Sequence, residues 1–296
     1  MHDPVFESRE RIEAARGGRT FEALAPGLWC AGSLAGLARP CIAIVGTRAA
    51  TQYGRRLAHR FATELAAGGC CVVSGLALGV DAAAHEGALS AGMPTIGVLG
   101  SGHRRFFPGR NRDLAERILA GGGAVLSPYQ PDQHAAPGQF LQRNGVVAAL
   151  ADAVLVVEAP ARSGALNTAG WAAGRVPVLA VPGDVDRRHS AGCLALIRDG
   201  ATLARNPADV FEALGLAPGA APPPPARAHD ELSLALLRAL DAGAAQFDEI
   251  VAHSGVAAPA ALAGLAMLEF DGTVESLGGS RYARVAPALC GEQHAR

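Results

Sequence analysis

Apolar runs of strand length alternate along most of the chain with segments whose apolar side chains recur at helical spacing. The runs predict six strands, at residues 41–45, 70–73, 94–99, 124–126, 153–157 and 177–181. The other segments predict helices at residues 53–67, 80–91, 112–120, 139–150, 166–173, 193–198 and 208–214. Strands that alternate with helices in this way favour a right-handed, doubly wound parallel sheet. The expected fold class is therefore α/β.

The first 40 residues lack this alternation. Residues 1–20 are charged and predict an N-terminal extension with one short helix, which frays or docks on the surface. Residues 21–40 carry apolar side chains between glycines and prolines, and predict an irregular strap against the sheet edge. We expect the α/β domain to cover residues 21–216.

The pattern changes again near the C-terminus. Residues 217–229 include four consecutive prolines, which predict a stiff linker. Residues 230–286 predict a small winged-helix domain, with helices at 232–240, 247–253 and 258–268 and a hairpin of strands at 273–277 and 281–285. Residues 287–296 are expected to form a tail.

Composition narrows the possible functions. Half of the 296 residues are hydrophobic, which is enough for a full core, and the formal net charge of −1 excludes a uniformly basic protein. The chain has no lysine, so a lysine Schiff base and a P-loop lysine are excluded. No catalytic triad signature, metal-binding motif or Walker A loop is present, so we expect no metal and no cofactor.

The six cysteines show no C-x-x-C spacing, and several lie within apolar runs. We expect buried, reduced thiols in a cytoplasmic protein. The charged N-terminus predicts no signal peptide, and no apolar run reaches the roughly 18 residues of a membrane span.

Arg48 stands at the carboxyl end of the first predicted strand, directly after Gly46 and Thr47. Ligands bind at this edge of an open α/β sheet, because the next helix begins there with free N–H groups. An arginine at this edge favours an anion, above all phosphate.

Small residues and arginines follow other strands of the same predicted sheet. Ser74 and Gly75 follow the second strand, and Arg162, Ser163 and Gly164 follow the fifth. Glycines allow a polyanion to approach backbone N–H groups. The alternative is that they only close tight turns, but their convergence on one edge favours a site.

Phe140 precedes Arg143 and Asn144 at helical spacing, so a base could stack on the ring while the guanidinium holds its phosphate. Packing of Phe140 in the core is an equal alternative. Asp81 is expected to be an N-cap or first-turn acid rather than a ligand contact. The arginines around Phe106 and Phe107 resemble a solvated charge run, although few acids offset them.

Several short motifs follow one another in order over about residues 41–205. They are Val45-Gly-Thr-Arg48, Ser74-Gly-x-Ala-x-Gly-Val-Asp81, Gly100-x-Gly102 with Phe107-Pro108 and Asn111, Phe140-x-x-Arg-Asn144, Val157-Glu-Ala159, Ser163-Gly-Ala-Leu-x-Thr-Ala169 and Val181-Pro-Gly183. With these motifs the chain resembles the DprA/Smf family of bacterial DNA-processing proteins. It departs from the family's common Arg-Asn-Arg at Gly145, and we expect the helical domain often found ahead of the Rossmann part to be missing here or reduced to the first 20 residues.

The resemblance implies an extended Rossmann domain that binds single-stranded DNA, forms a homodimer and loads RecA recombinase during natural transformation, without catalysis. It places the DNA site on Arg48, Phe140, Arg143, Asn144 and Arg162, with backbone groups of Gly46, Thr47, Ser163 and Gly164. Ser74, Gly75 and Thr168 complete the candidate DNA-binding residues.

Two alternatives stay open. The first is a Rossmann-type enzyme or sensor for a nucleotide derivative, whose usual Pro-Gly-Gly-x-Gly-Thr loop is replaced here by residues 162–168. The second is a transcription factor, but residues 258–268 of the predicted winged helix contain no Arg, Lys, Asn or Gln to read bases.

Overall fold

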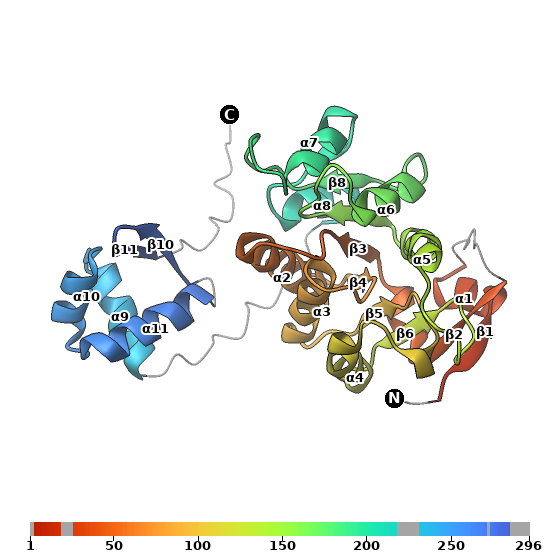
Figure 1. The fold of residues 1–296 in the computed structure, drawn as a ribbon, viewed down its shortest axis with the longest axis horizontal. Coiled ribbons are helices and arrows are strands. Elements are labelled where there is room, and N and C mark those ends of the chain that lie inside the picture. Colours follow the sequence, from red (N-terminus) through yellow and green to blue (C-terminus); the bar gives the residue numbers. More distant parts are fainter. Residues whose placement is uncertain (1–2, 19–25, 218–230, 271–272, 285–296) are drawn as a thin grey trace. The chain divides into compact units, whose positions relative to one another are not determined.

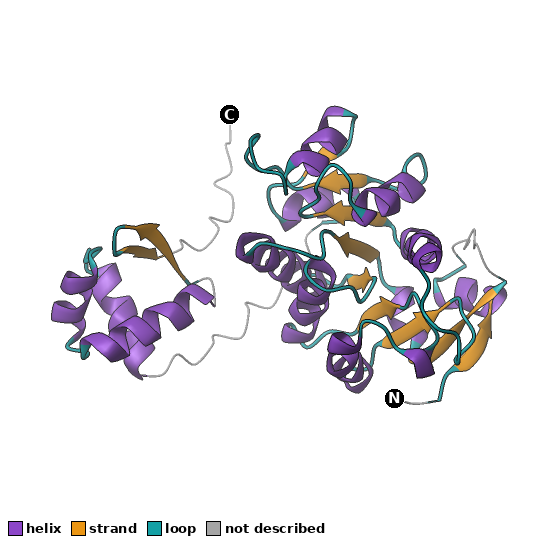
Figure 2. Cartoon of the chain, in the orientation of Figure 1, coloured by secondary structure: helices purple, strands orange, loops and turns teal. Residues whose placement is uncertain are grey.

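The computed structural model describes residues 3–18, 26–217, 231–270 and 273–284. The chain divides into two compact units, Met1–Pro224 and Pro225–Arg296, and each is described by itself. Figure 1 shows the first unit as a sheet with helices on both faces. The second unit combines three helices with a two-stranded sheet (Figure 2).

The described part of the larger unit contains a nine-stranded sheet, in the order β1-β2-β6-β5-β4-β3-β7-β8-β9. The strands are β1 Val5–Ser8, β2 Gly27–Gly32, β3 Cys41–Val45, β4 Cys71–Ser74, β5 Thr95–Val98, β6 Ala124–Ser127, β7 Ala153–Val156, β8 Val178–Ala180 and β9 Thr202–Leu203. Strands β3 to β9 pair in parallel, as predicted, whereas β1 and β2 pair antiparallel at one edge.

Helices cover both faces of this sheet, which confirms the doubly wound α/β fold class. They are α1 Arg9–Ala15, α2 Gln52–Ala67, α3 Val80–Ser90, α4 Arg112–Ala120, α5 Pro137–Leu150, α6 Gly164–Ala172, α7 Ala191–Arg198 and α8 Pro207–Ala213, with 3-10 turns η1 Leu34–Ala38, η2 His103–Arg105 and η3 Gly109–Asn111. One core layer packs α1, α5, α6 and α7 on the sheet, and the other packs α2, α3 and α8.

The sheet order changes direction at β3. The chain proceeds from β3 through β4 and β5 to β6 on one side, and then crosses back to β7, which pairs with β3 on the other side. Ile44 of β3 lies beside Leu155 of β7. The carboxyl ends of these two strands therefore flank a topological switch point, where an open α/β sheet presents a crevice for ligands.

The N-terminal residues are part of the sheet, which corrects the expectation of a peripheral extension and an irregular strap. Strand β1 pairs with β2, and the rings of Phe6 and Trp29 pack edge to face with centroids 5.6 Å apart. Ile12 of α1 is fully buried in the same core layer as α5. The expectation failed because these antiparallel strands stand outside the strand–helix alternation that marks the parallel core.

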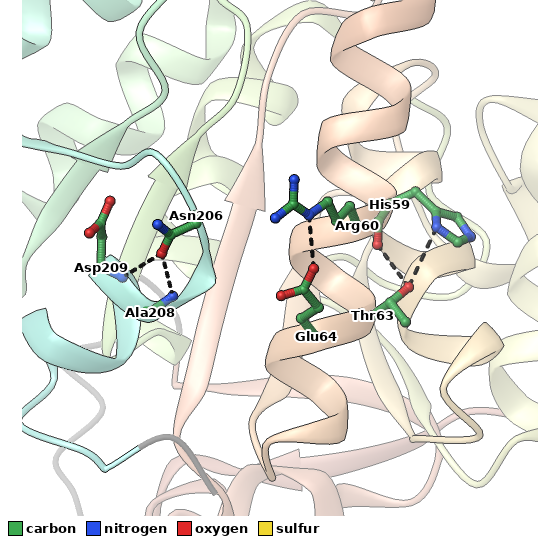
Figure 3. A network of polar contacts seen from close by, with 7 residues as sticks. All are labelled: His59, Arg60, Thr63, Glu64, Asn206, Ala208 and Asp209. Carbon is green, nitrogen blue, oxygen red and sulfur yellow. Dashed lines mark hydrogen bonds and ion pairs between the residues drawn. The ribbon is translucent and has the colours of Figure 1, made fainter. Parts of the chain in front are cut away.

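Local side-chain contacts secure the helices behind the sheet. Arg60 and Glu64 form an ion pair of 2.8 Å along α2, and Asn206 caps α8 by accepting hydrogen bonds from the N–H groups of Ala208 and Asp209 (Figure 3). An asparagine oxygen at a helix N-terminus satisfies N–H groups that have no partner inside the helix. These contacts stabilise helix geometry and lie outside the site described below.

The smaller unit contains helices α9 Glu231–Asp241, α10 Phe247–Ser254 and α11 Ala258–Phe270, followed by strands β10 Val274–Gly278 and β11 Arg281–Arg284. Leu236, Ile250, Leu265 and Val274 form its buried core. The predicted winged-helix arrangement is confirmed. Among the described helices, none alone is both long and apolar enough to cross a membrane, and α10 and α11 reach that length only together, across a bend of 109°.

Candidate functional site

A cleft of about 370 Å³ opens at the switch point of the large sheet. Its walls come from the loops that follow β3, β4 and β7 and from one side of α5. Ten predicted site residues line it: Gly46, Thr47, Arg48, Gly75, Arg143, Asn144, Arg162, Ser163, Gly164 and Thr168. The structure therefore brings together residues from four separate sequence motifs. The two other predicted residues, Ser74 and Phe140, lie next to the cleft rather than in its lining.

Arg48 and Arg162 form the rim of this cleft. Both side chains are exposed, and neither forms an ion pair with another described residue. The Arg48 guanidinium lies 5.1 Å from the centroid of the Phe140 ring, a cation–π contact. Phe140 in turn packs against Phe107 with ring centroids 5.8 Å apart. The rim thus presents two free cations and an aromatic platform.

Helix α6 begins beside Arg162. Ser163 is its N-cap and accepts a hydrogen bond from the Ala165 N–H at 3.3 Å. The side-chain amide of Asn144 donates to the Gly164 carbonyl at 3.1 Å and so ties α5 to this turn. Asn144 therefore holds the shape of the rim through Gly164.

Arg143 forms the floor of the cleft and is only 3% exposed. One of its terminal nitrogens donates to the carbonyl oxygens of Gly75 and Val98, the latter at 2.9 Å. These carbonyls belong to the loop after β4 and to the end of β5. The guanidinium thus braces two strand ends from below, and the binding of a phosphate by Arg143 stays a prediction.

Asp81 lies in the first turn of α3, as predicted, but its carboxylate caps a loop rather than the helix. It accepts hydrogen bonds from the N–H groups of Gly75 at 3.1 Å and Ala77 at 3.4 Å. Burial raises the pKa of Asp81, while the positive charge of Arg143 acts in the opposite direction. The buried acid and the buried base together fix the loop after β4.

The predicted site residues Ser74 and Gly75 both make contacts within the protein, so their part in DNA binding stays a prediction. Ser74 is fully buried, and its hydroxyl donates to the Ile44 carbonyl at 2.6 Å. The Gly75 N–H is already bound to Asp81. Gly75 is needed for another reason, because a Cβ at this position would overlap the Arg143 guanidinium. Thr168 is buried as well, at the back of the cleft.

Glu158 is a site residue that the sequence reasoning missed. It follows β7, is 7% exposed, and accepts hydrogen bonds from the Thr51 N–H at 2.9 Å and the Thr51 hydroxyl at 2.6 Å. Its backbone carbonyl accepts a hydrogen bond from the Thr47 N–H at 2.7 Å. These three bonds hold both ends of the loop that carries Arg48. The motif Val157-Glu-Ala159 was the available signal, and Gly54 was a second one, since a Cβ there would overlap the Glu158 carboxylate.

A second aromatic and basic hollow of about 490 Å³ adjoins the rim and shares Phe140 with it. Arg105 and Arg112 are exposed there, and Arg112 lies over the Phe106 ring at 5.4 Å. Arg104 instead forms ion pairs with Asp132 and Asp3. Among these arginines, Arg104 is thus paired with acids, whereas Arg105 and Arg112 have no acidic partner among the described residues.

Within the described residues, no group of three or more His, Cys, Asp or Glu side chains is placed to hold a metal ion. The five described cysteines are buried and unpaired. Burial raises the pKa of Cys30 and of Cys193 to about 12, so these thiols stay protonated at neutral pH.

The fold and the cleft define a Rossmann-like protein with a cationic ligand edge, joined to a winged helix. Residues 18–215 match the family described as DNA recombination-mediator protein A, and residues 220–280 match the DprA winged-helix domain. The chain belongs to the DprA/Smf family, as the motifs predicted.

Two sequence relatives show the extent of the likeness. The DNA processing protein DprA of Mycobacterium tuberculosis is 43% identical to this chain over 258 residues. These residues cover 84% of this chain and 66% of the relative. Protein Smf of Escherichia coli is 40% identical over 175 residues, which cover 58% of this chain and 46% of the relative. The chain thus spans slightly under two thirds of the first relative and less than half of the second.

Two solved structures share the fold. DprA of Streptococcus pneumoniae is 36% identical with a TM-score of 0.60, and the match covers 63% of this chain and 66% of that one. DprA of Helicobacter pylori, whose structure concerns its single-stranded DNA binding mode, is 32% identical with a TM-score of 0.59, covering 66% of this chain and 90% of that one.

Proposed function

We propose that this protein binds single-stranded DNA along the switch-point cleft, protects incoming DNA, and loads RecA recombinase on the strand during natural transformation. The observation that carries the proposal is the pair of free guanidinium groups, Arg48 and Arg162, above a buried cationic floor. The chain acts as a binding protein in this proposal, without catalysis.

The chemistry of the rim favours a flexible polyanion. Two unpaired arginines can each bind a phosphate through paired N–H groups. Phe140 offers a ring for stacking, which requires a base that is free of its Watson–Crick partner. A single strand satisfies both conditions, and the Helicobacter pylori relative with the same fold binds single-stranded DNA.

Transfer to RecA is supported by the family description as a recombination mediator. We propose in addition a homodimer and a cytoplasmic location, where RecA and incoming strands meet. Crosslinking of the full chain to RecA on an oligonucleotide tests the transfer, and light scattering tests the dimer. A protein that neither crosslinks to RecA nor raises the rate of RecA filament formation would contradict the transfer step.

The experiment for the site itself is oligo-dT binding at several salt concentrations. Arg48→Ala and Arg162→Ala should each weaken binding several-fold and reduce the slope of log affinity against log salt by about 0.7. Arg117→Ala is the matched control, because Arg117 is an exposed arginine at the far end of α4, paired with Glu86. Equal binding by all four proteins would contradict the cleft as the DNA site.

The alternative of a nucleotide-derivative enzyme has less support. Both carboxylate oxygens of Glu158, which lies beside the Arg48 loop, accept hydrogen bonds from Thr51, and Asp81 in the cleft lining accepts from the N–H groups of Gly75 and Ala77. Duplex reading by α11 is also disfavoured, since residues 258–270 present no Arg, Lys, Asn or Gln side chain.

A further inference from the structure

A second cleft opens on the same edge of the large sheet, and none of its lining residues lines the switch-point cleft. Its volume is about 600 Å³, within the roughly 300–1,000 Å³ of small-molecule sites. The walls are the start of α2, the end of β7 and the loop from β8 to α7. We propose that this cleft binds a nucleoside monophosphate unit.

One wall supplies a surface for a base. Tyr53 lies in the first turn of α2 and is 50% exposed. Tyrosine side chains are usually of intermediate burial, and half of this residue is open to solvent. A half-exposed ring that lines a cleft can stack on a nucleobase of any identity, because every base has a π-face. This wall therefore selects a flat, unsaturated group.

The opposite wall supplies positive charge. Arg187 and Arg188 are exposed on the loop between β8 and α7, next to His189. Arg187 forms an ion pair with Asp184 at 2.7 Å, but Arg188 has no partner among the described residues. Helix α7 begins at this wall, and its N-cap Ser190 makes no side-chain hydrogen bond to it, although the Gly192 N–H in the first turn is bound by the Ala159 carbonyl at 2.7 Å. A free guanidinium beside such a helix start favours phosphate.

Acids set a limit on the charge of the ligand. Glu158 and Asp184 also line the cleft, so its formal charge is close to neutral, unlike that of the switch-point rim. Carboxylates accept hydrogen bonds from sugar hydroxyls but repel a long polyphosphate. One base, one sugar and one phosphate match this mixture of an aromatic ring, acids and one free arginine.

The Glu158–Thr51 contact stands between the two clefts. Both residues line the second cleft, while Thr47 and Arg48, in the loop that they hold, line the first. A nucleotide unit in the second cleft is either a free mononucleotide or part of a strand that continues from Arg48. The strand form rests on the proposed function, whereas the free form does not.

Isothermal titration of the full chain with dTMP tests the free form. The wild type should bind dTMP, and Arg188→Ala and Tyr53→Ala should each weaken that binding about tenfold or more through loss of one charge-assisted contact or one stacking contact. Tyr53→Phe keeps the ring and should bind as the wild type does. Arg117→Ala lies outside both clefts and should bind dTMP as the wild type does.

Oligo-dT titration of the same variants identifies the source of the nucleotide. If the strand occupies the cleft, Arg188→Ala weakens oligo-dT binding as well; if only a free nucleotide does, oligo-dT binding stays at the wild-type level while dTMP binding falls. Wild-type behaviour of Arg188→Ala and Tyr53→Ala with both probes would overturn the second site. If that result came with weakened oligo-dT binding by Arg48→Ala, the proposed function would remain intact. If Arg48→Ala instead bound oligo-dT as the wild type does, the proposed function alone would be overturned.

Discussion

The floor and the rim of the switch-point cleft use the same residue type in opposite ways. Arg143 is buried below the cleft, and its guanidinium binds the carbonyl groups of Gly75 and Val98. Arg48 and Arg162 stand exposed above it with no acidic partner among the described residues. A buried arginine that donates to loop carbonyls stabilises the loops of a site, while an exposed and unpaired one is available to a ligand.

This difference predicts separate consequences for stability and for binding. Loss of the floor arginine should lower the free energy of unfolding more than it lowers the affinity for DNA. The reason is that a charge or carbonyl left without a partner in the interior is costly. Loss of the rim should change affinity with little effect on folding, because exposed side chains contribute little to stability.

The largest expected effect is on stability, from Arg143→Ala. The substitution leaves Asp81 buried without its neighbouring cation, and leaves two carbonyl oxygens without a donor. The free energy of unfolding should fall by roughly 3 kcal/mol, the range measured for broken buried pairs. Urea denaturation followed by circular dichroism measures it.

The control for this prediction is the double variant Arg143→Ala with Asp81→Asn. Removal of the second charge should recover part of the lost stability, as coupled neighbours do. A single Arg143→Ala variant that is as stable as the wild type but fails to bind oligo-dT would contradict the assignment of Arg143 to the floor.

The next effect comes from acid. His85 is fully buried on α3, and burial first, then the Arg143 charge, lower its pKa to about 3. Since the unfolded chain takes up a proton near pH 6.5 and the native state does so only near its lowered pKa, stability should fall as the pH decreases through this window. Between pH 7 and pH 5 the loss should be about 2 kcal/mol.

Urea denaturation at both pH values measures this loss, and a His85→Gln variant should show less of it. The rim should not respond in this way, because arginine stays protonated throughout. A wild type with equal stability at both pH values would contradict the burial of a neutral His85.

A smaller effect is expected where floor and rim connect, at Glu158. Glu158→Gln replaces an acceptor of the Thr51 N–H or hydroxyl by an amide that can donate, so the loop bearing Arg48 loses one hydrogen bond. Affinity for oligo-dT should fall by a factor of about three to ten, equivalent to one ordinary hydrogen bond.

A double-mutant cycle with Arg48→Ala separates positioning from general damage. If Glu158 acts through Arg48, Glu158→Gln should have no further effect on binding in the Arg48→Ala background. Equal losses in both backgrounds would show that Glu158 acts elsewhere in the fold.

The smallest effect concerns the winged helix. Leu262 and Met267 of α11 are 56% and 61% exposed, and the helix offers no cation to phosphate. The variant Leu262→Ser with Met267→Ser should bind oligo-dT within about twofold of the wild type, as surface substitutions away from a site usually do. A larger loss of affinity for oligo-dT would indicate that the winged helix, and not only the Rossmann cleft, contacts the DNA.

The parallel core could be predicted from sequence because each of its strands is an apolar run, as in the fully buried Cys41–Val45. The strands β1 and β2 could not, because their place in the sheet depends on pairing between β1 and β2 and between β2 and the distant β6. The bounds of the helices and strands inside the winged helix were predicted to within about two residues, since helix spacing and a tight turn are local signals.

The site was predicted as a set of positions but not as a division of roles. The end of a strand places Arg48, and helical spacing places Phe140 near Arg143. Whether a guanidinium points into the sheet or out of it depends on which carbonyl groups the folded chain leaves without donors. Glu158 escaped notice for the same reason, because its partner Thr51 is 107 positions away in the chain.

That separation also bears on how the protein is made. Arg48 emerges early in synthesis, but the strand that completes its surroundings, β7, follows only after β4, β5 and β6 have been produced. Parallel neighbours so distant along the chain close slowly and late. A nascent or truncated chain that ends before Ala153 would carry the first arginine of the rim without the wall that follows β7, so the cleft exists only in chains that extend past this strand.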